Sequence, residues 1–320
     1  GTDITYNGNI TVNGGILESV ADYAIYHPHT GTTTVNGGVI FGAAGGISLN
    51  RGKLIVNDGT ITSKGTGTTG NWGDGTGNQQ AAAINVNAKY ETTAVEIKGG
   101  KITAEKDAIL LTNGRNGTVA VSGGSFSSEI KPEYCAEGFV PAANADGTYG
   151  VKVAPVAKIG TVEYATLAEA IAAANDGETV TLIDDLDIST TGLTVAATKT
   201  VTLDLNGHAL KAANTNTGNI KVLGKLTLCD STDTEKNGTG TGKVWTDTPY
   251  IYNKQDKVLI AAIDGGTFTM ESGLIDTASS IADNANDGQF AVSVQNEHAD
   301  ATVIINGGHI KAGWYAVAGN

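Results

Sequence analysis

The chain has few arginines and no long apolar run. Arg51 and Arg115 are its two arginines among 320 residues, and 20 basic side chains stand against 33 acidic ones, for a net charge of −13. A surface with this balance repels phosphate backbones, so no nucleic acid partner is expected. No apolar run reaches about 18 residues, and no basic segment followed by an apolar stretch opens the chain, so neither membrane insertion nor a signal peptide is predicted.

Cysteine and proline are also scarce. The two cysteines, Cys135 and Cys229, have no second cysteine or histidine at metal-ligand spacing. They are either free or joined in one long-range disulfide, and one pair is not the dense framework of a small secreted domain. The 5 prolines contrast with 44 glycines, about twice the usual share. This composition predicts many tight turns between short strands rather than disorder.

A short motif recurs along the chain. "TVNGGIL" begins at residue 11, "TVNGGVI" at 34, "IVNDGTI" at 55, "EIKGGKI" at 96 and "AVSGGSF" at 120, so the intervals are 23, 21, 41 and 24 residues. "IINGGHI" follows much later, at residue 304. A period in the twenties indicates stacked units, each too small to bury its apolar face alone.

Each unit contains a strand, a turn, a second strand and a further short strand, with no helix between them. Asn followed by Gly accepts positive φ at low cost, which suits a sharp corner between two strands. The sequence therefore predicts an all-β fold, a right-handed parallel β-helix, whereas the leucine-rich repeat pattern is absent. Two ladders are expected. The inward ladder consists of Val12, Val35, Val56, Ile97 and Val121. The turn ladder includes Asn13, Gly14, Asn36, Gly37, Asn57, Asn306 and Gly307.

One segment departs from the β pattern. Apolar residues at helical spacing follow Thr166, with Glu169 three residues later as a capping box, which predicts a short capping helix near residues 166–175. Such a helix suits the open apolar end of a first coil. We therefore divide the chain into 1–154, the back part and closing segment of one β-helix module, and 155–320, the capping helix and front part of a second. The two parts would then form one period of a tandem array. The alternative is a fragment, or a complete protein whose ends are capped by loops.

Several of these segments together resemble the pectin lyase-like β-helix repeat regions of large surface proteins from gut Gram-positive bacteria. The carriers are "YATLAEAIAAANDGETVTLIDDL", "VTLDLNGHAL", the NGG repeats and "EYCAEGFVPAANADGTYGVKV". The resemblance covers most of the chain. It implies a secreted, wall-attached or filamentous protein whose β-helix serves as a stalk or adhesin, and it implies no activity.

The residues that could support catalysis or metal binding do not form a recognisable motif in the sequence. Asp184 and Asp185 are consecutive, so on a strand they would point to opposite faces. His27 and His29 lack a third ligand. The loops "DNANDG" and "DTEKNG" fail the EF-hand pattern, so no cofactor is predicted, although a carboxylate-rich turn could hold a structural calcium ion. Threonines do not recur at one register in the sequence, which disfavours ice binding.

Two polar insertions carry aromatic residues, and loops on a rigid scaffold often bind ligands. Residues 63–80 contain Trp72, and residues 230–257 contain Trp245, Tyr250 and Tyr252. These aromatics are candidate contacts for a ligand or partner. The alternative is that each tryptophan folds back and covers the edge of a coil.

The sequence thus favours a non-catalytic, extracellular structural or adhesive rod, stalk or filament subunit on a bacterial cell surface. Its expected partners are a second copy in head-to-tail association, or a continuation of the same chain, and also glycans or host surface proteins. The alternative is a polysaccharide-binding or polysaccharide-cleaving lyase or hydrolase with the same fold.

Overall fold

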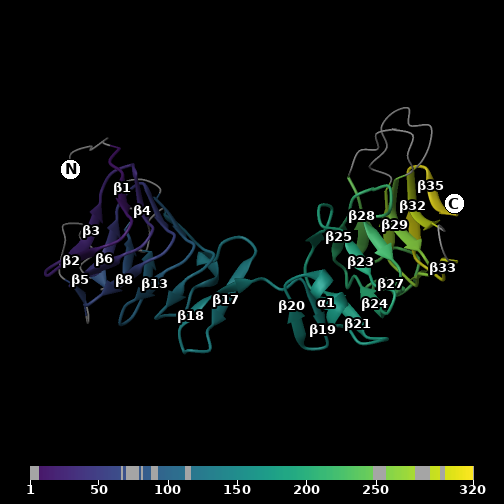
Figure 1. Ribbon diagram of the computed structural model, residues 1–320, viewed down its shortest axis with the longest axis horizontal. Coiled ribbons are helices and arrows are strands. Elements are labelled where there is room, and N and C mark those ends of the chain that lie inside the picture. The colour runs from purple at the N-terminus through teal and green to yellow at the C-terminus, as the bar shows by residue number, and fades with distance from the viewer. Residues whose placement is uncertain are drawn as a thin grey trace. The chain divides into compact units, whose positions relative to one another are not determined.

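The chain folds into two compact units, Gly1–Ala154 (unit 1) and Pro155–Asn320 (unit 2). The computed structural model, shown in Figure 1, describes residues 7–65, 68–69, 79–80, 82–87, 93–111, 117–247, 257–277, 289–295 and 300–319. The regular structure of these residues is nearly all β-strand, and its one α-helix lies in unit 2. The all-β prediction is confirmed. No helix among the described residues is both long and apolar enough to span a membrane.

Unit 1 is built from three parallel sheets, and consecutive strands of the chain enter different sheets in turn. We call three such consecutive strands a repeat. The first sheet contains β1 (Ile10–Val12), β4 (Thr32–Val35), β7 (Lys53–Val56), β12 (Thr93–Ile97) and β15 (Gly117–Val121). The second contains β2 (Ile16–Ser19), β5 (Val39–Gly42), β8 (Thr60–Ser63), β13 (Lys101–Thr103) and β16 (Ser125–Phe126). The third contains β3 (Tyr23–His27), β6 (Gly45–Leu49), β11 (Ile84–Val86) and β14 (Ile109–Leu111). A separate antiparallel pair joins β9 (Thr68–Thr69) to β10 (Gln79–Gln80).

The core of unit 1 is made of ladders of equivalent side chains. Each residue of the first sheet's inward ladder pairs with its counterpart in the next repeat, and all of them are buried. The members are Val12, Val35, Val56, Ile97 and Val121. This part of the prediction is confirmed. Burying one such side chain contributes about 1.5–3 kcal/mol, so the register that aligns them is strongly preferred over a one-residue slip.

The predicted turn residues lie at the corners between the first and second sheets. Asn36 Nδ2 donates to Asn13 Oδ1 at 2.8 Å, and Asn57 Nδ2 donates to Asn36 Oδ1 at 2.7 Å. In unit 2, Asn306 Nδ2 donates instead to Glu271 Oε1 at 2.7 Å. The last glycine of each corner has positive φ, for example +91° at Gly38. Side-chain hydrogen bonds therefore run from each of these corner asparagines toward the preceding repeat.

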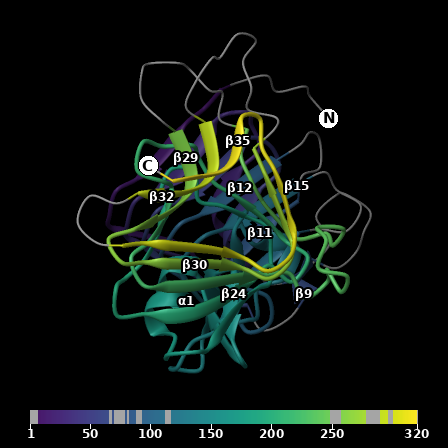
Figure 2. The same cartoon turned by 90° about the vertical axis from the view of Figure 1, so that its right-hand side faces the viewer.

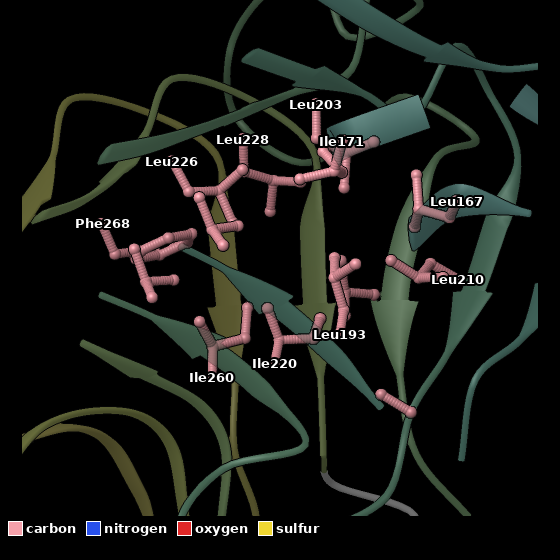
Figure 3. Packing of buried hydrophobic residues seen from close by; sticks show 14 of the residues in the cluster. Leu167, Ile171, Leu193, Leu203, Leu210, Ile220, Leu226, Leu228, Ile260 and Phe268 are labelled. Atoms are coloured by element: carbon pink, nitrogen blue, oxygen red, sulfur yellow. The ribbon is translucent and has the colours of Figure 1, made fainter. Parts of the chain in front are cut away.

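Unit 2 repeats the three-sheet arrangement. Its first sheet contains β21 (Thr179–Leu182), β24 (Thr200–Asp204), β27 (Lys225–Cys229), β30 (Thr267–Met270) and β33 (Thr302–Ile305). The second contains β22 (Leu186–Asp187), β25 (Ala209–Lys211), β28 (Lys243–Trp245), β31 (Leu274–Asp276) and β34 (His309–Lys311). The third contains β23 (Leu193–Val195), β26 (Ile220–Val222), β29 (Lys257–Ile263), β32 (Gln289–Gln295) and β35 (Tyr315–Gly319). Figure 3 shows side chains from all three sheets pointing into one buried cluster, among them Leu226, Leu210 and Ile260.

Each unit is closed at one end by segments that do not follow the repeat. At the end of unit 1, η1 (Pro132–Tyr134) precedes the antiparallel hairpin of β17 (Phe139–Ala143) and β18 (Tyr149–Val153), and β18 pairs with β16. At the start of unit 2, β19 (Ala157–Ile159) pairs antiparallel with β20 (Val162–Tyr164) and with β21. These hairpins cover edges that would otherwise continue the parallel pairing.

The α-helix α1 (Leu167–Ala173) adds to the closure of unit 2. Thr166 Oγ1 accepts the Glu169 N–H, and a Glu169 carboxylate oxygen accepts the Thr166 N–H, which forms the expected capping box. Leu167, Ala170 and Ile171 are buried in the core. The helix packs against β19, β20, β21 and β23, so it covers the first repeat of the unit.

The expectation that threonines do not recur at one register is wrong for the outward threonines of unit 2. Thr179, Thr202, Thr227 and Thr269 occupy one register on the first sheet. The repeats of unit 2 have dissimilar corners, so this register could not be aligned from sequence. The neighbouring column is interrupted by the charged Lys225, so these repeats do not form a continuous two-column threonine plane.

Alanine substitutions at two corner glycines distinguish the cost of backbone strain from the cost of steric crowding. Gly15 has φ +84° and open space where a Cβ would lie, whereas a Cβ at Gly38 would lie 2.9 Å from Gly15 O. We expect Gly15→Ala to lower the free energy of unfolding by about 1–2 kcal/mol through left-handed strain, and Gly38→Ala to lower it further. Urea unfolding measures both changes. Gly14→Ala, where a Cβ meets nothing within 4 Å, is the control, and equal costs at Gly15 and Gly38 would contradict the packing.

Candidate functional site: the Trp245 face

Of the aromatic residues predicted to contact a ligand, Trp245 is the one that the structure describes. Trp72, Tyr250 and Tyr252 lie outside the described residues. The polar surroundings of Trp245 in the sequence predict a loop, but the residue lies on strand β28. The reason is local alternation: Val244 is buried in the core, which directs its neighbours Lys243 and Trp245 outward.

The segment before β28 is held by two buried carboxylates. Asp230 accepts N–H bonds from Gly207 at 2.9 Å and Gly242 at 2.8 Å. Asp233 Oδ2 accepts from Gly238 and Gly273, each at 2.8 Å. Main-chain N–H groups therefore donate to both carboxylates.

The Asp233 contacts also determine its protonation. Burial alone raises the pKa of Asp233, but the N–H donors of Gly273, Gly238 and Asn237 outweigh burial, so the pKa lies below its ordinary value of 3.8. The carboxylate is therefore charged at neutral pH. It joins the loop to residues 40 positions apart in sequence, which fixes the approach to β28.

Trp245 belongs to an outward column on the second sheet of unit 2, which we call the Trp245 column. Its members are paired in register from strand to strand and come from five successive repeats. They are Asp187, Lys211, Trp245, Asp276 and Lys311. The indole therefore lies between a lysine on one neighbouring strand and a carboxylate on the other.

Charged groups surround the indole closely. Lys211 Nζ lies 5.5 Å from the ring centroid and Lys243 Nζ lies 4.9 Å from it, within the range of a cation–π contact. Lys211 Nζ is also 2.9 Å from Asp247 Oδ2 and 3.4 Å from Asp187 Oδ2. These side chains are thus held in place by contacts with one another on the outward face of the second sheet.

The same contacts shift two pKa values. The Asp247 carboxylate, and to a lesser degree Asp187, raises the pKa of Lys211. Hydrogen bonds from Ser189, followed by the charge of Lys211, lower the pKa of Asp187. Both groups are therefore charged at neutral pH.

This arrangement is suited to binding. A half-buried indole offers an apolar face, and the surrounding carboxylates and ammonium groups offer hydrogen bonds, which together match the alternating apolar and hydroxyl surfaces of a sugar ring. Among the described residues, no three His, Cys, Asp or Glu side chains form a group that could hold a metal ion.

The other polar candidates are not members of the Trp245 column. Asp184 and Asp185 lie in the turn between β21 and β22, not on a strand. Asp184 Oδ1 accepts the Asp185 N–H, and Asp185 Oδ1 accepts the Ala209 N–H. Cys135 and Cys229 are free, and they lie in different units. Burial raises the pKa of the Cys229 thiol to about 11, which makes this thiol a poor nucleophile at neutral pH.

His27 is buried within unit 1, which the sequence did not indicate. Its Nδ1 lies 2.7 Å from Thr33 Oγ1, and its ring meets the His29 ring edge-on with centroids 4.8 Å apart. Ser48, Asn50 and Asn85 are also buried polar residues of unit 1, on the strands of the third sheet or directly after one of them. Asn50 and Asn85 donate to the hydroxyls of Tyr26 and Tyr23. The signal for this burial lies in the neighbouring repeats, not in the local sequence.

The buried His27 predicts an acid-sensitive unit 1. Burial of the ring, and next the nearby His29, lowers the pKa of His27 below 6.5, so the native state favours the neutral ring. The stability that the neutral His27 ring contributes should be fully present above pH 6.5, the ordinary pKa of histidine. It should be lost as the pH falls through the lower pKa of the folded state. The free energy of chemical unfolding, measured between pH 4 and 8, tests this pH dependence. His27→Gln should flatten this dependence, whereas His309→Gln should not, and an unchanged profile in His27→Gln would contradict the assignment.

No protein-family model matches the chain, and no curated protein or solved structure is significantly similar to it. The resemblance to pectin lyase-like surface repeats therefore rests on the quoted sequence segments.

Proposed function

We propose that the chain is a non-catalytic structural and adhesive segment of an extracellular bacterial surface protein, built as two parts of right-handed parallel β-helices. The single observation that carries this proposal is the in-register pairing of equivalent strands over successive repeats, in three sheets per unit. Stacking of this kind makes each added repeat lengthen a stiff rod, which is the property that a stalk or filament needs. The net charge of −13 keeps such a rod soluble.

The surface location has a direct test. An antibody raised against the chain should label intact cells of the producing bacterium in immunogold electron microscopy, and protease added outside the cells should remove the label. Cells lacking the gene are the control. Label that is seen only after permeabilisation would contradict the proposal.

A polysaccharide-binding function is the second candidate, and the Trp245 face favours it. The acidic charge balance argues for a neutral glycan rather than a polyuronate. Carboxylates that are already paired with lysines suit hydrogen bonding to hydroxyls more than proton transfer.

We expect a neutral polysaccharide that binds the chain on a glycan array to lose about tenfold in affinity with Trp245→Ala, since an aromatic platform contributes about 1 kcal/mol or more. Trp314→Ala, which removes an exposed indole outside the second sheet, is the matched control. Equal losses of affinity in both variants would show that the Trp245 face is not the binding site. Release of reducing sugar from the bound glycan would instead favour the polysaccharide-cleaving alternative.

A further inference from the structure

The last repeat of unit 2, β33 to β35, exposes side chains that correspond to core residues in the repeat before it. Ile305 pairs with Met270, and Val317 pairs with Val292. Met270 and Val292 are 0% exposed, whereas Ile305 and Val317 are each 43% exposed. The strands β33, β34 and β35 are also the outermost members of their sheets among the described residues. This repeat, drawn in yellow and facing the viewer in Figure 2, is an apolar, unpaired end.

The first repeat of unit 1, β1 to β3, has the matching form. Its strands are likewise outermost in their sheets among the described residues, and Ile10 and Leu17 are half-buried against the core. Its corner Asn13–Gly15 has the same three residues as the corner Asn306–Gly308. The third strand begins at Tyr23 in one repeat and at Tyr315 in the other, eight and seven residues after the corner, so the two repeats can align over all three strands.

The hydrogen-bonding direction of the corners is also complementary. In unit 1, Asn36 donates both its N–H and its Nδ2 toward the preceding repeat, to Val12 O and Asn13 Oδ1. Asn306 likewise donates its N–H to Met270 O and its Nδ2 to Glu271. Within the described part of the chain, Asn306 Oδ1 accepts no hydrogen bond. The Nδ2 of a following Asn13 would donate to it in the way that Asn36 donates to Asn13.

Charge agrees with this register. Glu18 is the third residue after Gly15, and Lys311 is the third residue after Gly308, so aligned corners place the two side chains directly opposite each other. Lys311 Nζ already lies 3.5 Å from Asp276 Oδ2. A lysine between two carboxylates repeats the pattern of Lys211, which contacts both Asp187 and Asp247.

We propose that the last repeat of unit 2 binds the first repeat of unit 1 of a second copy of this chain, with strands parallel and corner Asn306 aligned with corner Asn13. The interface rests on the proposed function, because it requires stacking repeats. It uses different surfaces on the two copies, so it leaves a free end at each side and generates an open filament rather than a closed dimer. The hairpins and α1 prevent the closed ends of the units from pairing in the same way.

Two lysine substitutions at neighbouring residues test the interface. Ile304 and Ile305 are 40% and 43% exposed. Ile305 pairs with the core residue Met270, whereas Ile304 pairs with the outward Thr269. Ile305→Lys should weaken association at least about tenfold, because docking would bury an unpaired charge, whereas Ile304→Lys should associate like the unmodified chain. Sedimentation velocity over a concentration series of the full chain measures this.

Cross-linking tests the register. Chains carrying Ile304→Cys, when mixed with chains carrying Thr11→Cys, should form a disulfide heterodimer, since both residues are two positions before their corners. Ile304→Cys mixed with Ile16→Cys, which lies on a different sheet, and the unmodified chain with its native cysteines are the controls. The same heterodimer yield in the Ile16 mixture, or Ile304→Cys chains that cross-link mainly to themselves, would overturn the proposed register.

An unmodified chain that stays monomeric at every concentration would overturn the proposal, as would equal association of the two lysine variants. These outcomes are independent of the immunogold result. If intact cells are labelled but the purified chain is monomeric, the interface is wrong and the proposed function is unaffected. If only permeabilised cells are labelled, the proposed function is wrong even if the purified chain associates.

Discussion

Parallel hydrogen bonding between equivalent strands of successive repeats is the interaction on which the rest of the structure depends. It aligns identical positions, so apolar residues stack on the inside and polar residues stack on the outside. The inward valines of unit 1, the asparagine corners and the Trp245 column are all consequences of one register. A single-residue slip would expose the core ladder and separate Trp245 from Lys211 and Asp276 at the same time.

The same interaction creates the main liability of the fold, which is an unpaired strand at each end of a stack. Unit 1 ends in the β17–β18 hairpin and unit 2 begins with the β19–β20 hairpin and α1, so both of these edges are covered. The first repeat of unit 1 and the last repeat of unit 2 have no such cover among the described residues. The proposed interface pairs these two edges with each other.

Local signals in the sequence were sufficient for the corners and the helix. Positive φ at Gly38 and the capping box between Thr166 and Glu169 depend on a few adjacent residues, so both could be predicted. Non-local features could not. Trp245 looked like a loop residue because the preceding residues 230–242 are polar and rich in glycine, and the burial of His27 depends on repeats more than 20 residues away. The threonine register of unit 2 was hidden by corners of unequal composition.

Methyl NOE spectroscopy of the isotopically labelled chain reports the register between neighbouring strands. We expect strong NOEs between the methyl groups of Val35 and those of both Val12 and Val56, because these residues are directly opposite one another on adjacent strands. Absence of these NOEs, with NOEs from Val35 to outward positions such as Ile55 instead, would show that the strands pair in a different register.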